Sequence, residues 1–156
     1  NFKIMMKIIL ITTLLILSSC GYKPMYSKDT INNFYFKEIE LIGNKTINQK
    51  LISSGLLVED KNVQSNKKLI IDSKLIVIET SKDSEGLVET YRSILNVNLI
   101  FFENNISVKN KTFSRTFSYP NKSNRFELLE YQNTVEKNLT SEIIKDLIIF
   151  FNINDS

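Results

Sequence analysis

The sequence has no histidine and no tryptophan, and it has a single cysteine among its 156 residues. Without imidazole side chains, zinc sites and catalytic triads that need histidine are excluded. A lone cysteine excludes a disulfide bond within the chain. A strong charge of one sign is also missing, because the formal net charge is only +3 at pH 7. This small excess gives no electrostatic basis for binding nucleic acid, so we expect no such partner. Because histidine is missing, we also expect no metal site.

The first 19 residues have the features of a secretory signal peptide. Lys3 and Lys7 precede an apolar run over residues 8–17, and two serines follow it. A basic start, a short apolar run and then small residues are typical of export signals. The run is too short for a membrane-spanning helix, which needs roughly 20 apolar residues. We therefore predict a signal peptide over residues 1–19.

The end of this segment, Leu17-Ser18-Ser19-Cys20-Gly21, resembles the lipobox of bacterial lipoproteins. In that family the cysteine sulfur receives a diacylglycerol, the preceding peptide is cleaved, and the freed amine takes an acyl chain. The resemblance implies these lipid groups on Cys20 and no other cofactor. Several acyl chains on one residue would anchor a protein stably to a membrane. Gly21 resembles the outer-membrane class, since inner-membrane lipoproteins often carry Asp there. The alternative is an unmodified cysteine within a signal peptide.

We expect residues 20–33 to form a lipidated tether and residues 34–156 to form one domain. Pro24 biases the preceding residue toward an extended conformation, which stiffens the start of the tether. The segment from Ser27 to Asn33 is polar and is typical of a linker. The remaining length is enough for a single hydrophobic core.

The first part of the domain contains one predicted strand and one predicted helix. Aromatic and β-branched residues predict a strand over Phe34–Ile42, and Gly43-Asn44 predicts a turn. Apolar positions at helical spacing predict a short helix over Thr46–Leu57. We predict a loop from Val58 to Lys67.

Three long segments then alternate between apolar and polar residues, which indicates strands with one covered face. The predicted turns between them are Ser81–Gly86 and Glu103-Asn104-Asn105. The apolar positions, strand by strand, are Leu69, Ile71, Leu75 and Val77; Leu95, Val97, Leu99 and Phe101; and Phe113, Phe117 and Tyr119. Arg115 falls among the apolar positions of the third strand, so we expect either a bulge or a partly open face there.

After Pro120 the sequence predicts one long amphipathic helix. Asn124 is a candidate N-cap and Glu127 is its reciprocal acid three residues later. The apolar positions recur every three or four residues: Leu128, Tyr131, Val135, Leu139, Ile143, Leu147 and Phe150. Ile144, Ile148 and Phe151 widen the apolar face, which is explained either by a wide core or by a partner surface.

These elements predict an α+β fold of two layers. We expect a mostly antiparallel four-stranded sheet with two helices packed on one face, in the order β-α-β-β-β-α. The uncovered face of the sheet would be free for a functional contact.

The start of the mature chain, Cys20-Gly21-Tyr22-Lys23-Pro24-Met25-Tyr26, resembles that of the lipopolysaccharide-assembly lipoprotein LptE in its alphaproteobacterial form. Ser118-Tyr119-Pro120-Asn121, which leads into the long helix, and the order of elements also resemble this family. The resemblance implies an outer-membrane lipoprotein that plugs an LptD-like β-barrel and assists its assembly. The pair delivers lipopolysaccharide to the cell surface, so the expected partners are the barrel, lipopolysaccharide and the membrane, and no reaction is catalysed.

Cationic side chains on or beside the strands are candidate contacts for lipopolysaccharide or for the partner, because lipopolysaccharide carries phosphates. For each one, a solvated surface side chain is the simpler explanation. The candidates are Lys74, Arg92, Lys109, Lys111 and Arg115.

Two other function classes stay open. The first is another envelope adaptor, such as an auxiliary lipoprotein of a transporter or a secretin pilotin. The second is a hydrolase that uses Glu127 and Glu130 as an acid and base pair, although capping already explains Glu127. Ser65-Asn66-Lys67-Lys68 matches a Ser-x-x-Lys pattern, but the companion motifs of that enzyme class are missing.

Overall fold

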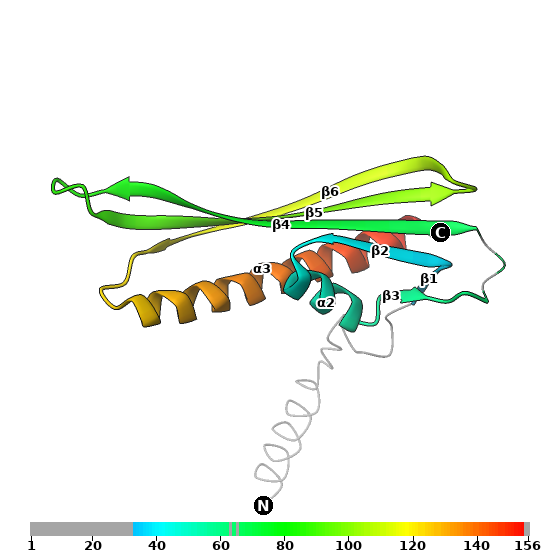
Figure 1. The fold of residues 1–156 in the computed structure, drawn as a ribbon, viewed down its shortest axis with the longest axis horizontal. Helices are drawn as coiled ribbons and strands as arrows, with labels where there is room; N and C mark the ends of the chain where they lie inside the picture. The colour runs from blue at the N-terminus through cyan, green and yellow to red at the C-terminus, as the bar shows by residue number, and fades with distance from the viewer. Residues whose placement is uncertain (1–32, 63, 65, 155–156) are drawn as a thin grey trace, which may run out of the picture. The chain divides into compact units, whose positions relative to one another are not determined.

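The computed structural model describes residues 33–62, 64 and 66–154. Its elements, in chain order, are β1 (Phe34–Phe36), β2 (Glu38–Gly43), α2 (Lys45–Ser53), β3 (Leu57–Glu59), β4 (Lys67–Lys82), β5 (Val88–Glu103), β6 (Ile106–Pro120) and α3 (Arg125–Asn154) (Figure 1). The predicted signal peptide and nearly all of the predicted tether lie outside the described residues.

The main sheet has four strands in the order β2-β4-β5-β6. Strands β4, β5 and β6 are antiparallel neighbours of 16, 16 and 15 residues, and β2 pairs with β4 in parallel. Both helices lie on the same face of this sheet (Figure 1). The predicted α+β sandwich with a mostly antiparallel sheet is therefore confirmed.

Turn chemistry sets the register of the two long hairpins. Asn104 and Asn105 both have positive φ angles, 50° and 66°, as a two-residue hairpin turn requires. In the first hairpin the Asp83 carboxylate accepts hydrogen bonds from the backbone N–H groups of Glu85 and Leu87, at 2.9 and 2.8 Å. Both predicted turns are present.

The first part of the domain differs from the sequence prediction. The single strand predicted over residues 34–42 is two strands, and β1 pairs in parallel with β3 in a second small sheet. The segment over residues 58–67 was predicted as a loop, but β3 enters it. The predicted helix ends at Ser53 rather than Leu57, because Gly55 has a φ of +77°. Strands of three residues are too short to show an alternating pattern, so the sequence could not reveal the small sheet.

The core lies between the main sheet and the two helices. Alternate residues of β4 and β5 are fully buried there: Leu69, Ile71, Leu95, Val97 and Leu99. Helix α2 begins at the N-cap Asn44, whose side-chain oxygen accepts a hydrogen bond from the backbone N–H of Ile47 at 3.1 Å. Ile47 and Leu51 then enter the core. The Lys50 ammonium joins α2 to Glu136 of α3 at 2.9 Å.

Helix α3 covers the sheet with the predicted apolar face. Its N-cap is Asn124, whose side chain accepts a hydrogen bond from the backbone N–H of Phe126 at 2.8 Å. The buried apolar positions are Val135, Leu139, Ile143, Leu147 and Phe151. Phe151, which the sequence predicts to widen this face, is buried, whereas Phe150 is only half-buried. Phe151 therefore belongs to the core.

Candidate functional site

The face of the sheet opposite the helices carries no described helix or loop (Figure 1). Residues directly opposite each other in neighbouring strands share a face, so the register identifies the residues of this open face. One row across β4, β5 and β6 consists of Ile76, Ile94 and Thr116. The row two strand positions away consists of Lys74, Asn96 and Ser114. The open face is thus a mixture of half-buried isoleucines and polar side chains.

Strand β6 gives this open face a polar margin. Its open-face residues are small or polar and all exposed: Asn110, Thr112, Ser114, Thr116 and Ser118. Hydroxyl and amide groups can donate and accept hydrogen bonds, so this margin suits a polar partner surface.

The structure separates the five cationic candidates onto two faces. Lys74 and Arg92 lie on the open face, where Arg92 is opposite Ser118 and donates to its hydroxyl at 3.0 Å. Lys109, Lys111 and Arg115 lie on the helix side of β6, opposite Phe101, Leu99 and Leu95. The five therefore do not form one site. The lipid-attachment candidate Cys20 lies outside the described residues.

Arg115 has a structural partner that explains its position among apolar residues. Its guanidinium donates two hydrogen bonds to the Asp146 carboxylate of α3, at 2.8 and 2.5 Å. This carboxylate raises the pKa of Arg115. The register shift between β5 and β6 falls at Phe101/Phe102, so no bulge occurs at Arg115. The covered face is therefore partly open here, since Arg115 and Phe117 are both exposed, and the ion pair joins this edge to α3.

The two lysines on the helix side of β6 lie over aromatic rings. The Lys109 ammonium is 4.7 Å from the centre of the Phe150 ring, and the Lys111 ammonium is 5.7 Å from that of Phe113. Cation–π contacts of this kind hold long side chains against the domain.

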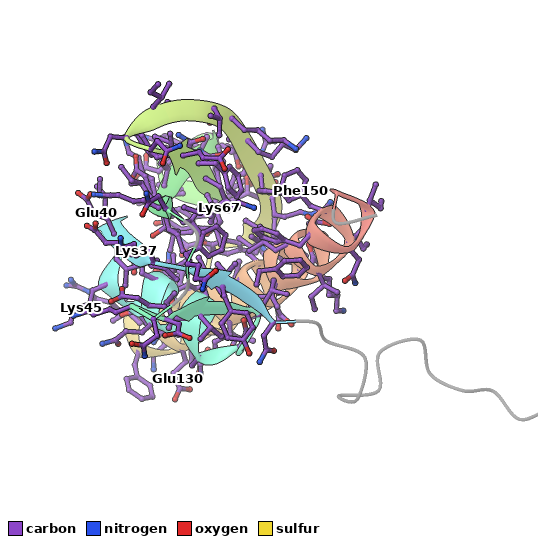
Figure 2. The ribbon with its side chains drawn as sticks, turned by 90° about the vertical axis from the view of Figure 1, so that its right-hand side faces the viewer. Lys37, Glu40, Lys45, Lys67, Glu130 and Phe150 are labelled. Atoms are coloured by element: carbon purple, nitrogen blue, oxygen red, sulfur yellow. The ribbon has the colours of Figure 1, made fainter. Side chains whose placement is uncertain are left out.

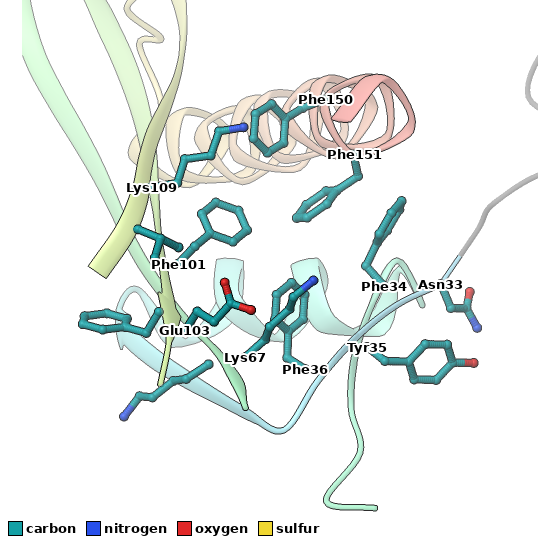
Figure 3. Close-up of a pocket in the computed structure, with 13 residues that line it drawn as sticks. Asn33, Phe34, Tyr35, Phe36, Lys67, Phe101, Glu103, Lys109, Phe150 and Phe151 are labelled. Atoms are coloured by element: carbon teal, nitrogen blue, oxygen red, sulfur yellow. The ribbon is translucent and has the colours of Figure 1, made fainter. Parts of the chain in front are cut away.

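A cavity of about 450 Å³ opens at the end of the domain where β1, β5 and the last turn of α3 meet. We call it the end cavity. Figure 2 looks toward this end and shows Lys67 and Phe150 there. Six phenylalanines line it. Five of their rings form one cluster, those of Phe34, Phe36, Phe101, Phe150 and Phe151 (Figure 3). The rings touch one another, with centres 4.6 Å apart for Phe34 and Phe151 and 6.1 Å apart for Phe101 and Phe150.

Charged groups surround this apolar space. Lys67, Lys109 and Glu103 line it, as Figure 3 shows. Lys68 also lines the cavity but forms ion pairs with Glu38 and Glu40 at 3.0 and 2.9 Å, which raise its pKa. An apolar space with cationic groups at its mouth can hold a molecule that has an apolar part and an anionic part.

The end cavity is not evident from the sequence. The available signals were the adjacent Phe150 and Phe151 and the closely spaced Phe34 and Phe36. These pairs lie more than a hundred positions apart, so only the tertiary fold brings them together.

Among the helices that the structure describes, none has the length and apolar character needed to cross a membrane. Within the same residues, no cluster of three or more acidic, histidine or cysteine side chains could hold a metal ion.

Comparison of folds places this domain beside solved bacterial lipoproteins. Rare lipoprotein B from Shewanella oneidensis aligns with a TM-score of 0.52 and 12% identity, over 75% of this chain and 97% of that one. Lipoprotein B from Nitrosomonas europaea aligns with a TM-score of 0.58 and 13% identity, over 82% and 88% of the two chains. A minor lipoprotein from Acinetobacter baumannii aligns with a TM-score of 0.58 and 10% identity, over 80% of this chain and 95% of that one. The chain thus has the fold of these lipoproteins.

No family profile matches the sequence, and no curated protein sequence matches it.

Proposed function

We propose that this chain is a lipoprotein of the outer membrane, anchored on the periplasmic side through lipid groups on Cys20. Two separate observations support the proposal. The segment ending at Cys20 resembles a lipobox, and the fold of the domain is that of solved proteins named rare lipoprotein B, lipoprotein B and minor lipoprotein. The lipobox and the folded domain lie in different parts of the chain, so the two observations are independent.

Metabolic labelling tests the anchor. The wild-type chain should incorporate labelled palmitate and lose its first 19 residues, whereas Cys20→Ser should remain an unlabelled precursor. Ser19→Ala is the matched control, because a small residue is kept beside the cysteine. Equal labelling of wild type and Cys20→Ser would exclude the lipoprotein proposal.

We further propose that the domain binds and plugs an LptD-like β-barrel that transports lipopolysaccharide, and that it catalyses no reaction. The single observation that carries this step is the open sheet face with its polar margin on β6. The inner wall of an outer-membrane barrel is polar, and exposed hydroxyl and amide groups can form hydrogen bonds to it. A stable complex of this kind would bury more than roughly 1,000 Å² of surface.

Depletion of the protein in its native bacterium tests the proposed partner. Folded LptD-like barrel and surface lipopolysaccharide should both decrease, and the barrel should co-purify with the protein in mild detergent. Normal levels of both, together with the failure of an inner-membrane transport process, would contradict the barrel proposal and favour the envelope adaptor. Complementation with the wild-type chain is the control.

A further inference from the structure

The end cavity is a space that neither the core nor the open sheet face uses. It opens to the solvent at the surface of the domain, so a molecule can enter it. A volume of about 450 Å³ lies within the usual range for small-molecule sites, roughly 300–1,000 Å³. The five phenyl rings make one part of its wall apolar (Figure 3), and charged side chains and backbone groups make the other part polar. A hydrocarbon chain can pack against the apolar part.

The charges at the mouth favour an anion. Lys67 and Lys109 bring two ammonium groups to the lining, against one carboxylate from Glu103. Lys109 already lies over the Phe150 ring. Lys67 is exposed and makes no ion pair with another residue that the structure describes. It can therefore take a carboxylate or phosphate oxygen as its partner.

The surface around the mouth is also apolar. Large apolar side chains from β1, the start of β6 and the end of α3 are exposed at this end: Tyr35 at 49%, Ile106 at 68%, Val108 at 59% and Ile153 at 70%. Tyr35 and Val108 line the cavity itself. Exposed apolar side chains grouped around a cavity are typical of a surface that meets lipid or another apolar partner.

We propose that the end cavity binds one acyl chain of an anionic single-chain lipid, such as a fatty acid or a lysophospholipid. The phenyl rings hold the hydrocarbon, and Lys67 pairs with the anionic head group at the mouth. The volume accommodates one chain rather than several. This site adjoins one end of the polar margin, since Val108 and Lys109 of β6 line it. It goes beyond the proposed barrel partnership because lipid binding there does not require a barrel.

Photocrosslinking in membranes tests this site on the full-length chain. Lysophosphatidylglycerol with a diazirine on its acyl chain is added to membranes that contain the protein, and the adducts are mapped by mass spectrometry after irradiation. Adducts should fall on the peptides that contain residues 34–36, 101 and 150–151. Lys67→Glu should lower their yield about tenfold, since it replaces a charged hydrogen bond with repulsion, and Lys67→Arg should restore it.

A second variant blocks the cavity without changing its charge. Val108→Trp places a large ring at the mouth and should abolish the adducts. Val77→Trp is the matched control, because Val77 is also exposed on a strand, at 42%, but does not line the cavity. Melting curves of both variants show whether each one is folded.

Three outcomes would overturn the proposal. Adducts that map elsewhere would exclude the end cavity, and equal labelling by a neutral monoacylglycerol probe would exclude anion selection. A large rise in labelling for Cys20→Ser would mean that the chain's own lipid fills the cavity. None of these results depends on a barrel partner, so they leave the proposed function to its own test.

Discussion

The two faces of the main sheet are built from alternate residues of the same strands, yet they differ in almost every property. On the covered face, Leu69, Leu95 and Leu99 are completely buried. Their neighbours Ile70, Ile94 and Ile100 on the open face keep part of their surface exposed, and polar residues are interspersed among them. A shift of one residue in register would exchange the two faces. The covered face therefore fixes the fold, and the open face can be specialised for a partner.

Substitution in the helix that covers the sheet should have the largest effect on stability. Leu139 of α3 is 2% exposed, and Leu139→Asp would bury an unpaired charge, which costs roughly 3–5 kcal/mol. We expect the domain to lose its cooperative thermal transition in circular dichroism. Asn138→Asp, at the exposed neighbouring position, should melt as the wild type does. An unchanged melting curve for Leu139→Asp would show that this helix face is not core.

The junction between β2 and α2 should be the next most sensitive position. Gly43 has a φ of +87°, and a Cβ atom there would lie 2.0 Å from the carbonyl oxygen of Ser73 on β4. Gly43→Ala therefore adds a backbone clash to the strain of a positive φ, and we expect a loss of about 2–3 kcal/mol in the free energy of unfolding. Gly86 has a φ of +84°, and a Cβ atom added there would have no other atom within 4 Å. Gly86→Ala should therefore lower the free energy of unfolding by only about 1–2 kcal/mol. If urea titrations show that the two variants lose the same free energy of unfolding, the clash at Gly43 is excluded.

A smaller effect is expected at the edge of the covered face. Asp146→Asn removes the charge that pairs with Arg115, and because both side chains are partly exposed, we expect the melting temperature to fall by roughly 1–4 °C. High salt should reduce this difference. Because the pKa of Arg115 is raised, the ion pair stabilises the fold fully below the ordinary arginine pKa, and this stabilisation is lost only as the pH rises above it. A difference in melting temperature between wild type and Asp146→Asn that grows toward pH 6 would therefore contradict the assigned ion pair.

Substitution on the open face should leave folding nearly unchanged. Ser114 and Thr116 of β6 are exposed there, so Ser114→Glu combined with Thr116→Glu should change the free energy of unfolding by about 0.5 kcal/mol or less. We expect the same variant to lose its co-purifying barrel. Ser141→Glu on the exposed side of α3 is the control for added charge. Full retention of the partner by the β6 variant would show that the polar margin is not an interface.

Local patterns predicted much of this fold, and distant contacts explain what they missed. Period-two alternation identified the three long strands, and the spacing of Val135, Leu139 and Ile143 identified α3. The small β1–β3 sheet was missed because each of its strands has three residues. Arg115 was ambiguous because its partner, Asp146, lies 31 positions away on another element. The end cavity was missed for the same reason, since its rings come from β1, β5 and the end of α3, which are far apart in the sequence.

The most direct test of the central claim is to find what the open face contacts in the cell. A photoreactive amino acid is placed at Lys74 or Thr112 on the open face, and at Lys137 on the exposed side of α3 for comparison. We expect positions 74 and 112 to cross-link efficiently to an LptD-like outer-membrane barrel and position 137 to do so much less. Cross-links from the open face to an inner-membrane complex, or to no protein at all, would contradict the claim.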